Sequence, residues 1–266
     1  KIFLVNGEIA EQFEDKKNDR VLYELKKFMK LLAEGNPNIV ESLWVPEQFT
    51  LYSNKYWQKI VDNKHLFLSK KLKFTHMGYA LAQLKKIRTH RKYLLNPPNH
   101  KPTRQEFNLQ DHVSITQDQL NAVLYVSNEY VKDEFQEMAR NELRYKSAKT
   151  DWDSYQEWYK NRNWKRKELE AKSGYDTKSC SHLVRLMKMG EDLLTKGEVI
   201  FPLPYADFLL DIRNGAWNYD QAEQYAEQME TKFDELYETS ILPQSVNYKK
   251  VQQLMIEILS EFYNID

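Results

Sequence analysis

Three nitrogen-bearing side chains with helical spacing form the clearest chemical pattern in the sequence. Lys178, His182 and Arg185 stand at i, i+4 and i+7 within "GYDTKSCSHLVRLMKMG", a spacing that stacks side chains on one face of an α-helix. Asp176 has the side chain of a helix N-cap, so Lys178 would lie beside the free N–H groups and positive dipole end of the helix. The pattern fits an anion site, with Lys178 as a point charge and Arg185 as a fork, and also fits a solvated helix face.

Motifs for several common chemistries are absent from the sequence. It contains no GxGxxG, Walker phosphate loop, GxSxG or HExxH, and its six histidines lie far apart without close metal-ligand spacing. The single cysteine, Cys180, excludes an intrachain disulfide and favours a reducing compartment. The only Asp-x-Asp pair, Asp151-Trp152-Asp153, falls in a region with helical periodicity.

Composition predicts a soluble globular protein without a membrane-spanning segment. The chain has 266 residues, 41% of them hydrophobic and 29% charged, and no stretch approaches the roughly 18 apolar residues of a membrane span. Its net charge of zero conceals basic segments at 85–92 and 160–167 and an acidic segment at 220–238. The basic, Trp-bearing region 152–167 suits a phosphate backbone with rings for base stacking, or a solvated helix face.

Periodicity predicts an α+β fold that is predominantly helical. The first fifty residues are the exception, because 1–5 and 19–23 are short β-prone runs that indicate the remnant of a small sheet. "GNPN" at 35–38 should end one helix and start another. Asn218 and Gln221 form a capping-box pattern for a later helix. A Pro-rich loop is expected at about 93–118, where it could cover a site or a partner.

A helix is also predicted from 69 to about 90, and it has two different stripes. We expect one stripe to face the core, and the opposite one to face either a cleft or water. The core stripe comprises Phe74, Met77, Leu81 and Leu84, and the mixed stripe comprises His76, Tyr79, Gln83, Ile87 and His90.

Five segments together resemble a known family. "NDRVLYELKKFMKLLAEGNPNIVESLWVPE", "SKKLKFTHMGYALAQLKKI", "NHKPTRQEF", "SGYDTKSCSHLVRLMKMGEDLLTKGEV" and "DIRNGAWNYDQAEQYAEQME" look, in that order, like the signature blocks of the RNA-ligase-associated nucleotidyltransferases. These are a predicted branch of the DNA polymerase β superfamily, found in bacteria and large tailed phages. The resemblance implies that 1–50 is the C-terminal part of a nucleotidyltransferase α/β core and that 51–266 is a helical domain.

The same resemblance implies an activity. Such enzymes transfer a nucleoside monophosphate from a nucleoside triphosphate to a hydroxyl acceptor with two Mg²⁺ (or Mn²⁺) ions, and the family's name favours an RNA or tRNA end as acceptor. Asp19 would be the third, catalytic metal-binding acid, unless it is an exposed strand-end aspartate. The residues that would bind the triphosphate or the acceptor phosphate, or line that cleft, are Asp176, Lys178, His182, Arg185, Tyr79 and Gln83.

The sequence also departs from the family pattern. No glycine is followed by serine, and the Asp-x-Asp pair at 151–153 lies far downstream of the family's metal motif. "KIFLVNGEIAEQFE" resembles the stretch that follows this motif, so we expect the motif to lie upstream of Lys1 or to have been lost. The alternative functions are a catalytically inactive relative that binds a nucleotide, nucleic acid or host protein, and a nucleotidyltransferase that modifies a protein or small molecule. The expected location is the cytoplasm of a bacterial or phage-infected cell.

Overall fold

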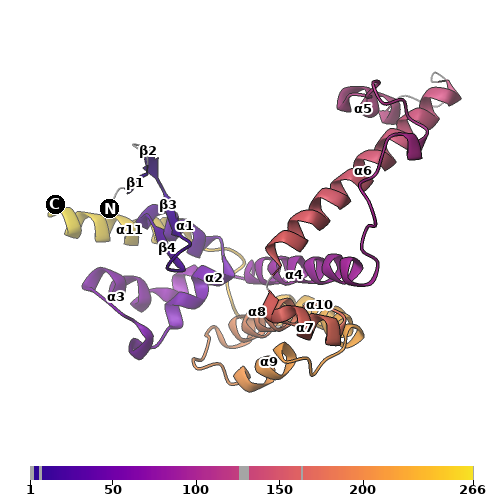
Figure 1. The fold of residues 1–266 in the computed structure, drawn as a ribbon. Helices are drawn as coiled ribbons and strands as arrows, with labels where there is room; N and C mark the ends of the chain where they lie inside the picture. The colour runs from indigo at the N-terminus through magenta and orange to yellow at the C-terminus, as the bar shows by residue number, and fades with distance from the viewer. Residues whose placement is uncertain (1–2, 6–7, 126–131, 163, 266) are drawn as a thin grey trace. The chain divides into compact units, whose positions relative to one another are not determined.

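The computed structural model describes residues 3–5, 8–125, 132–162 and 164–265. It confirms a predominantly helical α+β fold (Figure 1). The chain forms two compact units: the first joins Lys1–Arg88 to Asp176–Asp266, and the second is Thr89–Tyr175. No helix within the described ranges is both long and apolar enough to cross a membrane.

Two short hairpins open the first unit. β1 (Phe3–Val5) pairs antiparallel with β2 (Glu8–Ala10), and β3 (Gln12–Asp15) pairs antiparallel with β4 (Arg20–Tyr23). The β-prone runs predicted at 1–5 and 19–23 thus correspond to β1 and β4. The strands β2 and β3 were not predicted because their sequences, EIA and QFED, are short and rich in acidic residues.

Short helices follow the hairpins. α1 (Leu25–Ala33) is capped by Glu24, and Gly35, with φ of 74°, lies between it and α2 (Pro37–Val40). The 3₁₀ helices η1 (Glu41–Trp44) and η2 (Glu47–Phe49), the helix α3 (Lys55–Asp62) and the 3₁₀ helix η3 (Lys64–Phe67) come next. The expected role of "GNPN" is confirmed, since Asn36 Oδ1 accepts a hydrogen bond of 3.1 Å from Asn38 N at the start of α2.

The expected domain boundary at residue 50 differs from the observed grouping. α1 packs against α11 (Tyr248–Tyr263) at the far end of the chain, and α3 also packs against α11. The first fifty residues therefore share their compact unit with the C-terminal helix and do not form a separate one.

The prediction of which side of α4 (Leu72–Leu95) faces the core was partly wrong. Met77 and Leu84 are buried as expected, but Phe74 is 57% exposed, while His76 and Ile87 are fully buried. The ring of Phe74 packs edge-on against Tyr237 at 5.4 Å between centroids. The apolar side chains of Phe74 and Leu81 suggested one buried side of α4. The buried side in the structure is rotated about the helix axis from it, so that His76 and Ile87 are buried.

The remaining helices of the first unit pack around α8. α8 (Thr177–Lys196) contacts α9 (Ala206–Arg213) and α10 (Tyr219–Thr239). Gly190 allows a close approach, because a Cβ atom there would lie 2.8 Å from Phe233 Cζ and 2.9 Å from His76 Cβ. The predicted capping box of Asn218 and Gln221 is present at the start of α10.

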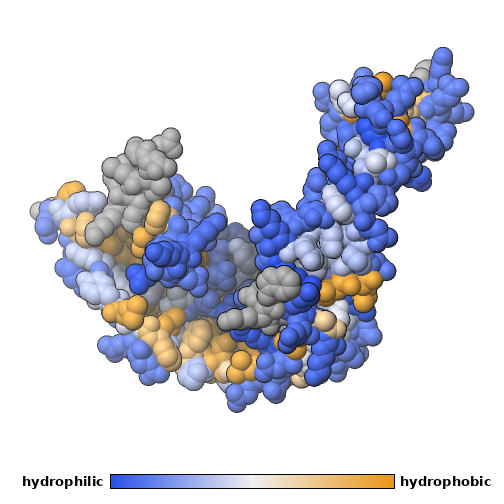
Figure 2. Space-filling model, in the orientation of Figure 1, coloured by the Kyte–Doolittle hydropathy of each residue, from blue (hydrophilic) through white to orange (hydrophobic). Residues whose placement is uncertain are grey.

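The second unit consists of the end of α4, the 3₁₀ helix η4 (Gln105–Phe107), α5 (Gln117–Tyr125), α6 (Asp133–Asn161) and α7 (Trp164–Ser173). α4 continues to Leu95, so the Pro-rich loop begins slightly later than expected. The surface of the second unit over α5 and the adjoining part of α6 is largely hydrophilic (Figure 2).

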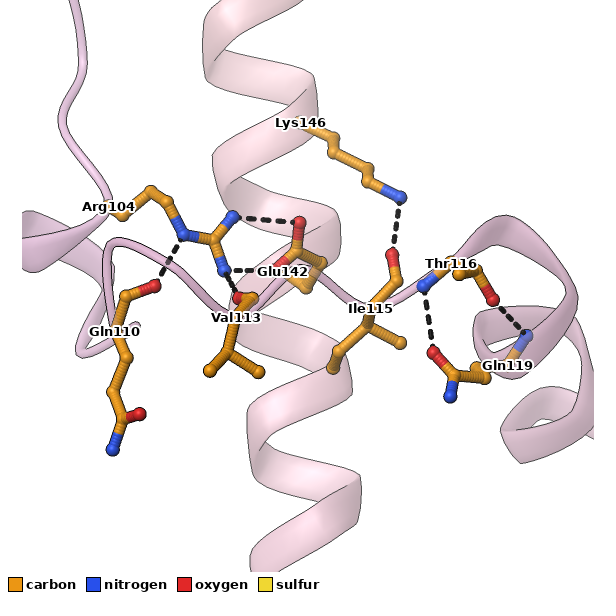
Figure 3. Close-up of polar contacts among 8 residues, drawn as sticks. All are labelled: Arg104, Gln110, Val113, Ile115, Thr116, Gln119, Glu142 and Lys146. Atoms are coloured by element: carbon orange, nitrogen blue, oxygen red, sulfur yellow. Dashed lines mark hydrogen bonds and ion pairs between the residues drawn. The ribbon is translucent and has the colours of Figure 1, made fainter.

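Arg104 fixes this Pro-rich loop to α6 (Figure 3). Its Nη1 and Nη2 atoms donate to the two carboxylate oxygens of Glu142, which is 1% exposed, at 3.1 and 2.8 Å. Its Nε donates to Gln110 O at 2.7 Å, and Nη2 also donates to Val113 O. Lys146 on α6 adds a bond of 3.0 Å to Ile115 O. The loop is therefore an ordered part of the second unit.

Candidate functional site

The start of α8 has the geometry that its sequence predicts. Asp176 is confirmed as the N-cap: its Oδ1 accepts a hydrogen bond of 3.0 Å from Ser179 N, and its Oδ2 accepts one of 2.8 Å from Ser179 Oγ. Thr177 Oγ1 donates to Arg213 O at 2.8 Å. The buried Asp176 carboxylate thus uses a first-turn amide itself, and cationic side chains lie farther along the helix.

His182 lies among three cations. Burial, followed by the charges of Arg185, Lys178 and Lys86, lowers the pKa of His182 to about 4. Lys178 and Arg185 are on α8, whereas Lys86 comes from α4 and lies 3.9 Å from Asp176 Oδ2. The structure therefore brings the predicted triplet together and adds a fourth nitrogen-bearing side chain. His182 is neutral at pH 7 because burial, and then the neighbouring positive charges, disfavour its charged form.

Arg185 links this group to another part of the unit. Its Nη1 donates to Glu41 Oε2 at 2.6 Å, and its Nη2 lies 3.3 Å from His182 Nδ1. Since a guanidinium only donates, His182 Nδ1 is the acceptor and the ring proton lies on Nε2. Burial raises the pKa of Glu41, while Arg185 opposes this shift. The guanidinium is thus partly committed to Glu41.

His76 is a buried neighbour of Arg185. Its Nδ1 donates to Leu72 O at 3.0 Å, and its Nε2 is buried with no hydrogen-bond partner among the described residues. Burial lowers the pKa of His76 to about 4, with a smaller contribution from the charge of Arg185. Both histidines near Arg185 are therefore neutral at pH 7.

Tyr79 and Gln83 lie on the side of α4 that carries Lys86. The three residues stand at i, i+4 and i+7, so they share one helix face. Tyr79 is 39% exposed, and its hydroxyl accepts a hydrogen bond of 2.8 Å from Asn36 Nδ2. Their assignment to a phosphate-binding cleft rests on this shared face, and it stays a prediction.

Asp19 is in a different setting. It lies in the exposed turn between β3 and β4 with φ of 52°, next to the Asn18 side chain that donates to Asp15 at 2.7 Å. No group of three or more His, Cys, Asp or Glu residues in the described parts of the chain could hold a metal ion. The structure therefore does not gather metal ligands around Asp19.

The Asp-x-Asp pair lies on α6 and its first carboxylate is engaged. Asp151 Oδ2 accepts a hydrogen bond of 2.6 Å from Lys92 Nζ, and Asp151 Oδ1 accepts one of 3.4 Å from the Tyr93 hydroxyl. Residues i and i+2 of a helix do not face each other, so Asp153 points to a different side. This pair does not have the shared orientation that two metal ions require.

Sequence reasoning missed Lys86, Glu41 and His76 as members of the group around Arg185. Lys86 could have been found, because it stands seven residues after Tyr79 on the same helix face. His76 was assigned to the cleft side, and its burial depends on how α4 packs. Glu41 lies 144 residues from Arg185 and has no local signal.

Together, the fold and this group define a predominantly helical α+β protein with a cationic cluster on α8. The chain is similar to the uncharacterized 38.9 kDa protein of the nrdC–mobD intergenic region of Enterobacteria phage T4, with 24% identity over 234 residues. That similarity covers 79% of this chain and 69% of the phage protein. No family model matches the chain, and no solved structure matches it.

Proposed function

We propose that the chain supplies the phosphate-binding face of a nucleotidyltransferase that acts on a nucleic-acid end. The observation that carries this proposal is the set of three cations around the neutral His182. Two carboxylates, Glu41 and Asp176, lie beside Arg185 and Lys86. A triphosphate bound there would lie among these cations and close to the positive end of the α8 dipole.

In the proposed reaction, a hydroxyl oxygen of the acceptor attacks the α-phosphorus of a nucleoside triphosphate. The bond from that phosphorus to the bridging oxygen breaks, pyrophosphate leaves and the hydroxyl proton is released. Lys178 and Arg185 would neutralise phosphate oxygens. His182 would donate a hydrogen bond from Nε2–H, because Nδ1 already accepts from Arg185. The support for this reaction is the resemblance to the RNA-ligase-associated family; the T4 relative is uncharacterized and fits only the phage setting of that family.

The described residues do not fit the two-metal centre that such a transfer uses. Asp19 lies in an exposed turn, and no group of three or more His, Cys, Asp or Glu residues in the described part of the chain could hold a metal ion. We therefore assign to these residues phosphate binding and no metal-dependent step. The same observation favours a second candidate function, a catalytically inactive relative that binds a nucleotide, a nucleic acid or a host protein.

Calorimetry with ATP, GTP, CTP and UTP in EDTA tests the phosphate site. We expect the double variant Lys178→Gln/His182→Gln to bind its best triphosphate roughly tenfold more weakly, because two charged or donor contacts are lost. Lys188→Gln is the matched control, since Lys188 is also on α8 but lies 3.7 Å from Glu191. Absence of triphosphate binding, or equal loss in the control, would refute the site.

A transfer assay separates the enzyme from the binding module. The protein as expressed from its gene is incubated with each α-labelled triphosphate, Mg²⁺ or Mn²⁺, and tRNA, single-stranded DNA or protein. Label on tRNA supports the proposed function, and label on protein supports a different acceptor. Triphosphate binding without any transfer supports the inactive binding module.

A further inference from the structure

A group of aromatic rings lies along the C-terminal part of α6. Tyr155 is at its centre, with its ring centroid 6.1 Å from that of Trp152, 5.9 Å from that of Trp158 and 6.1 Å from that of Tyr159. These four residues lie within eight positions of one helix. A single helix therefore presents a continuous aromatic surface within the second unit.

The end of α4 holds the inner rings in place. Tyr93, which is 3% exposed, lies 5.4 Å from Tyr155 and 5.5 Å from Trp158, measured between centroids. His90 lies 5.7 Å from Trp158, and the Arg162 guanidinium is 4.8 Å from the Trp158 ring centre. Rings packed on one side in this way lose little conformational freedom when a flat ligand stacks on their outer side.

The outer side of the aromatic group has lysines at both ends. Lys149, Trp152, Gln156 and Tyr159 follow one another at intervals of three, four and three residues, which places them on one helix face. Tyr159 is 53% exposed, and Lys149 and Lys160 are exposed as well. We name these five residues, Lys149, Trp152, Gln156, Tyr159 and Lys160, the outer stripe.

We propose that the outer stripe binds a single-stranded nucleic acid by stacking bases on Tyr159 and Trp152. This inference assigns a binding surface to the nucleic-acid partner of the proposed function, and in that respect the inference rests on the proposed function. Residues 152 and 159 are separated by about 10 Å along the helix, so two bases of one strand can each meet a ring. The terminal lysines are placed to meet the backbone phosphates.

The chemistry of the stripe favours a nucleic acid over a protein partner. The cores of protein–protein interfaces are depleted of lysine, whereas here Lys149 and Lys160 adjoin the two outer rings. Asp153 and Glu157 lie farther around α6 from Tyr159, and they neighbour Lys149 (i+4) and Lys160 (i−3) respectively. In the proposed mode, the two rings make the base contacts, and Lys149 and Lys160 make the phosphate contacts.

Fluorescence anisotropy tests the proposal with the full chain in EDTA and without triphosphate. The probes are fluorescein-labelled oligouridylate, oligothymidylate and an RNA duplex. We expect both single strands to bind, and Tyr159→Ala to weaken that binding about tenfold, the effect of losing one stacked base. Tyr159→Phe should bind like the parent because its ring remains, and Lys149→Gln should reduce the dependence of affinity on salt.

Tyr52→Ala is the control, because Tyr52 is 80% exposed and belongs to the other unit. It should leave binding unchanged. The proposal is overturned if neither single strand binds, if Tyr159→Ala binds like the parent, or if the duplex binds as tightly as the single strands. Because no triphosphate is present, a failure to bind the oligonucleotides would not argue against triphosphate binding at the α8 site. Likewise, a failure to bind triphosphate at the α8 site would not argue against oligonucleotide binding by the outer stripe.

Discussion

Arg185 and Glu41 are joined by an ion pair of 2.6 Å between Nη1 and Oε2, although they lie 144 residues apart in the sequence. Both side chains are about one-quarter exposed or less, at 25% for Arg185 and 21% for Glu41. If the proposed site binds phosphate, Glu41 would compete with it for the Arg185 guanidinium. The proposed α8 site can therefore be tested by two substitutions, of Arg185 and of Glu41, that should change triphosphate affinity in opposite directions.

Removal of each partner should change triphosphate affinity in opposite directions. Arg185→Ala should weaken binding roughly tenfold or more, because a charge-assisted hydrogen bond is lost. Glu41→Gln should strengthen it, because the guanidinium loses its competing carboxylate. Calorimetry measures both affinities, and circular dichroism checks that both variants are folded. Weaker binding by Glu41→Gln would contradict the predicted competition.

Stability should fall in mildly acidic solution because of His182 and His76. Each has a folded-state pKa of about 4 against an ordinary value of 6.5. The unfolded chain therefore binds more protons in this range, and the stabilisation is complete above about pH 6.5 and lost as the pH falls towards 4. Urea unfolding across this range should show a smaller pH dependence in His182→Gln, and an unchanged slope would contradict the shift.

Gly190→Ala should lower the free energy of unfolding by about 1–2 kcal/mol, since overpacking outweighs the gain in helix propensity. The added Cβ would lie 2.8 Å from Phe233 Cζ. Gly78→Ala is the matched control, because nothing lies within 4 Å of a Cβ at that position of α4. It should stabilise the protein by about 0.5–1 kcal/mol. Chemical denaturation measures both, and equal effects would disprove the close approach.

Glu142→Ala should destabilise the second unit by about 3 kcal/mol, because the partly buried Arg104 guanidinium loses its carboxylate. The double change Arg104→Met/Glu142→Leu should recover part of this loss, since it removes both charges together, but the bonds from Arg104 to Gln110 O and Val113 O are lost as well. Hydrogen exchange of the α6 amides reports the effect. Lys196→Ala, at an exposed i, i+4 pair, should change stability by less than about 1 kcal/mol. A similar effect of Lys196→Ala and Glu142→Ala would rule out a special role for the buried pair.

Local signals in the sequence predicted much of the helical framework. The caps at Asn36, Asp176 and Asn218 were identified because a cap depends on a few neighbouring residues. The buried side of α4 was not identified correctly, because Phe74 and His76 look like core and surface residues by type. Tertiary packing places the histidine inside and leaves the phenylalanine at the edge.

The candidate site shows the same division between local and distant information. The spacing of Lys178, His182 and Arg185 was sufficient to place them together, since all three lie on α8. The ion pair with Glu41 depends on how distant segments pack and leaves no trace in local spacing. The metal-binding acids that the family resemblance implies were not found as a group in the described residues.

The order of segments along the chain has a consequence for synthesis on the ribosome. Thr89–Tyr175 is continuous, whereas the other unit is assembled from Lys1–Arg88 and Asp176–Asp266. A nascent chain leaves the ribosome N-terminus first, and a unit that is continuous in sequence can fold as it emerges. Thr89–Tyr175 can therefore fold before α11 is synthesised, whereas α1 and α3 cannot pack against α11 until then. During that interval, the faces of α1 and α3 that pack against α11 remain exposed to solvent.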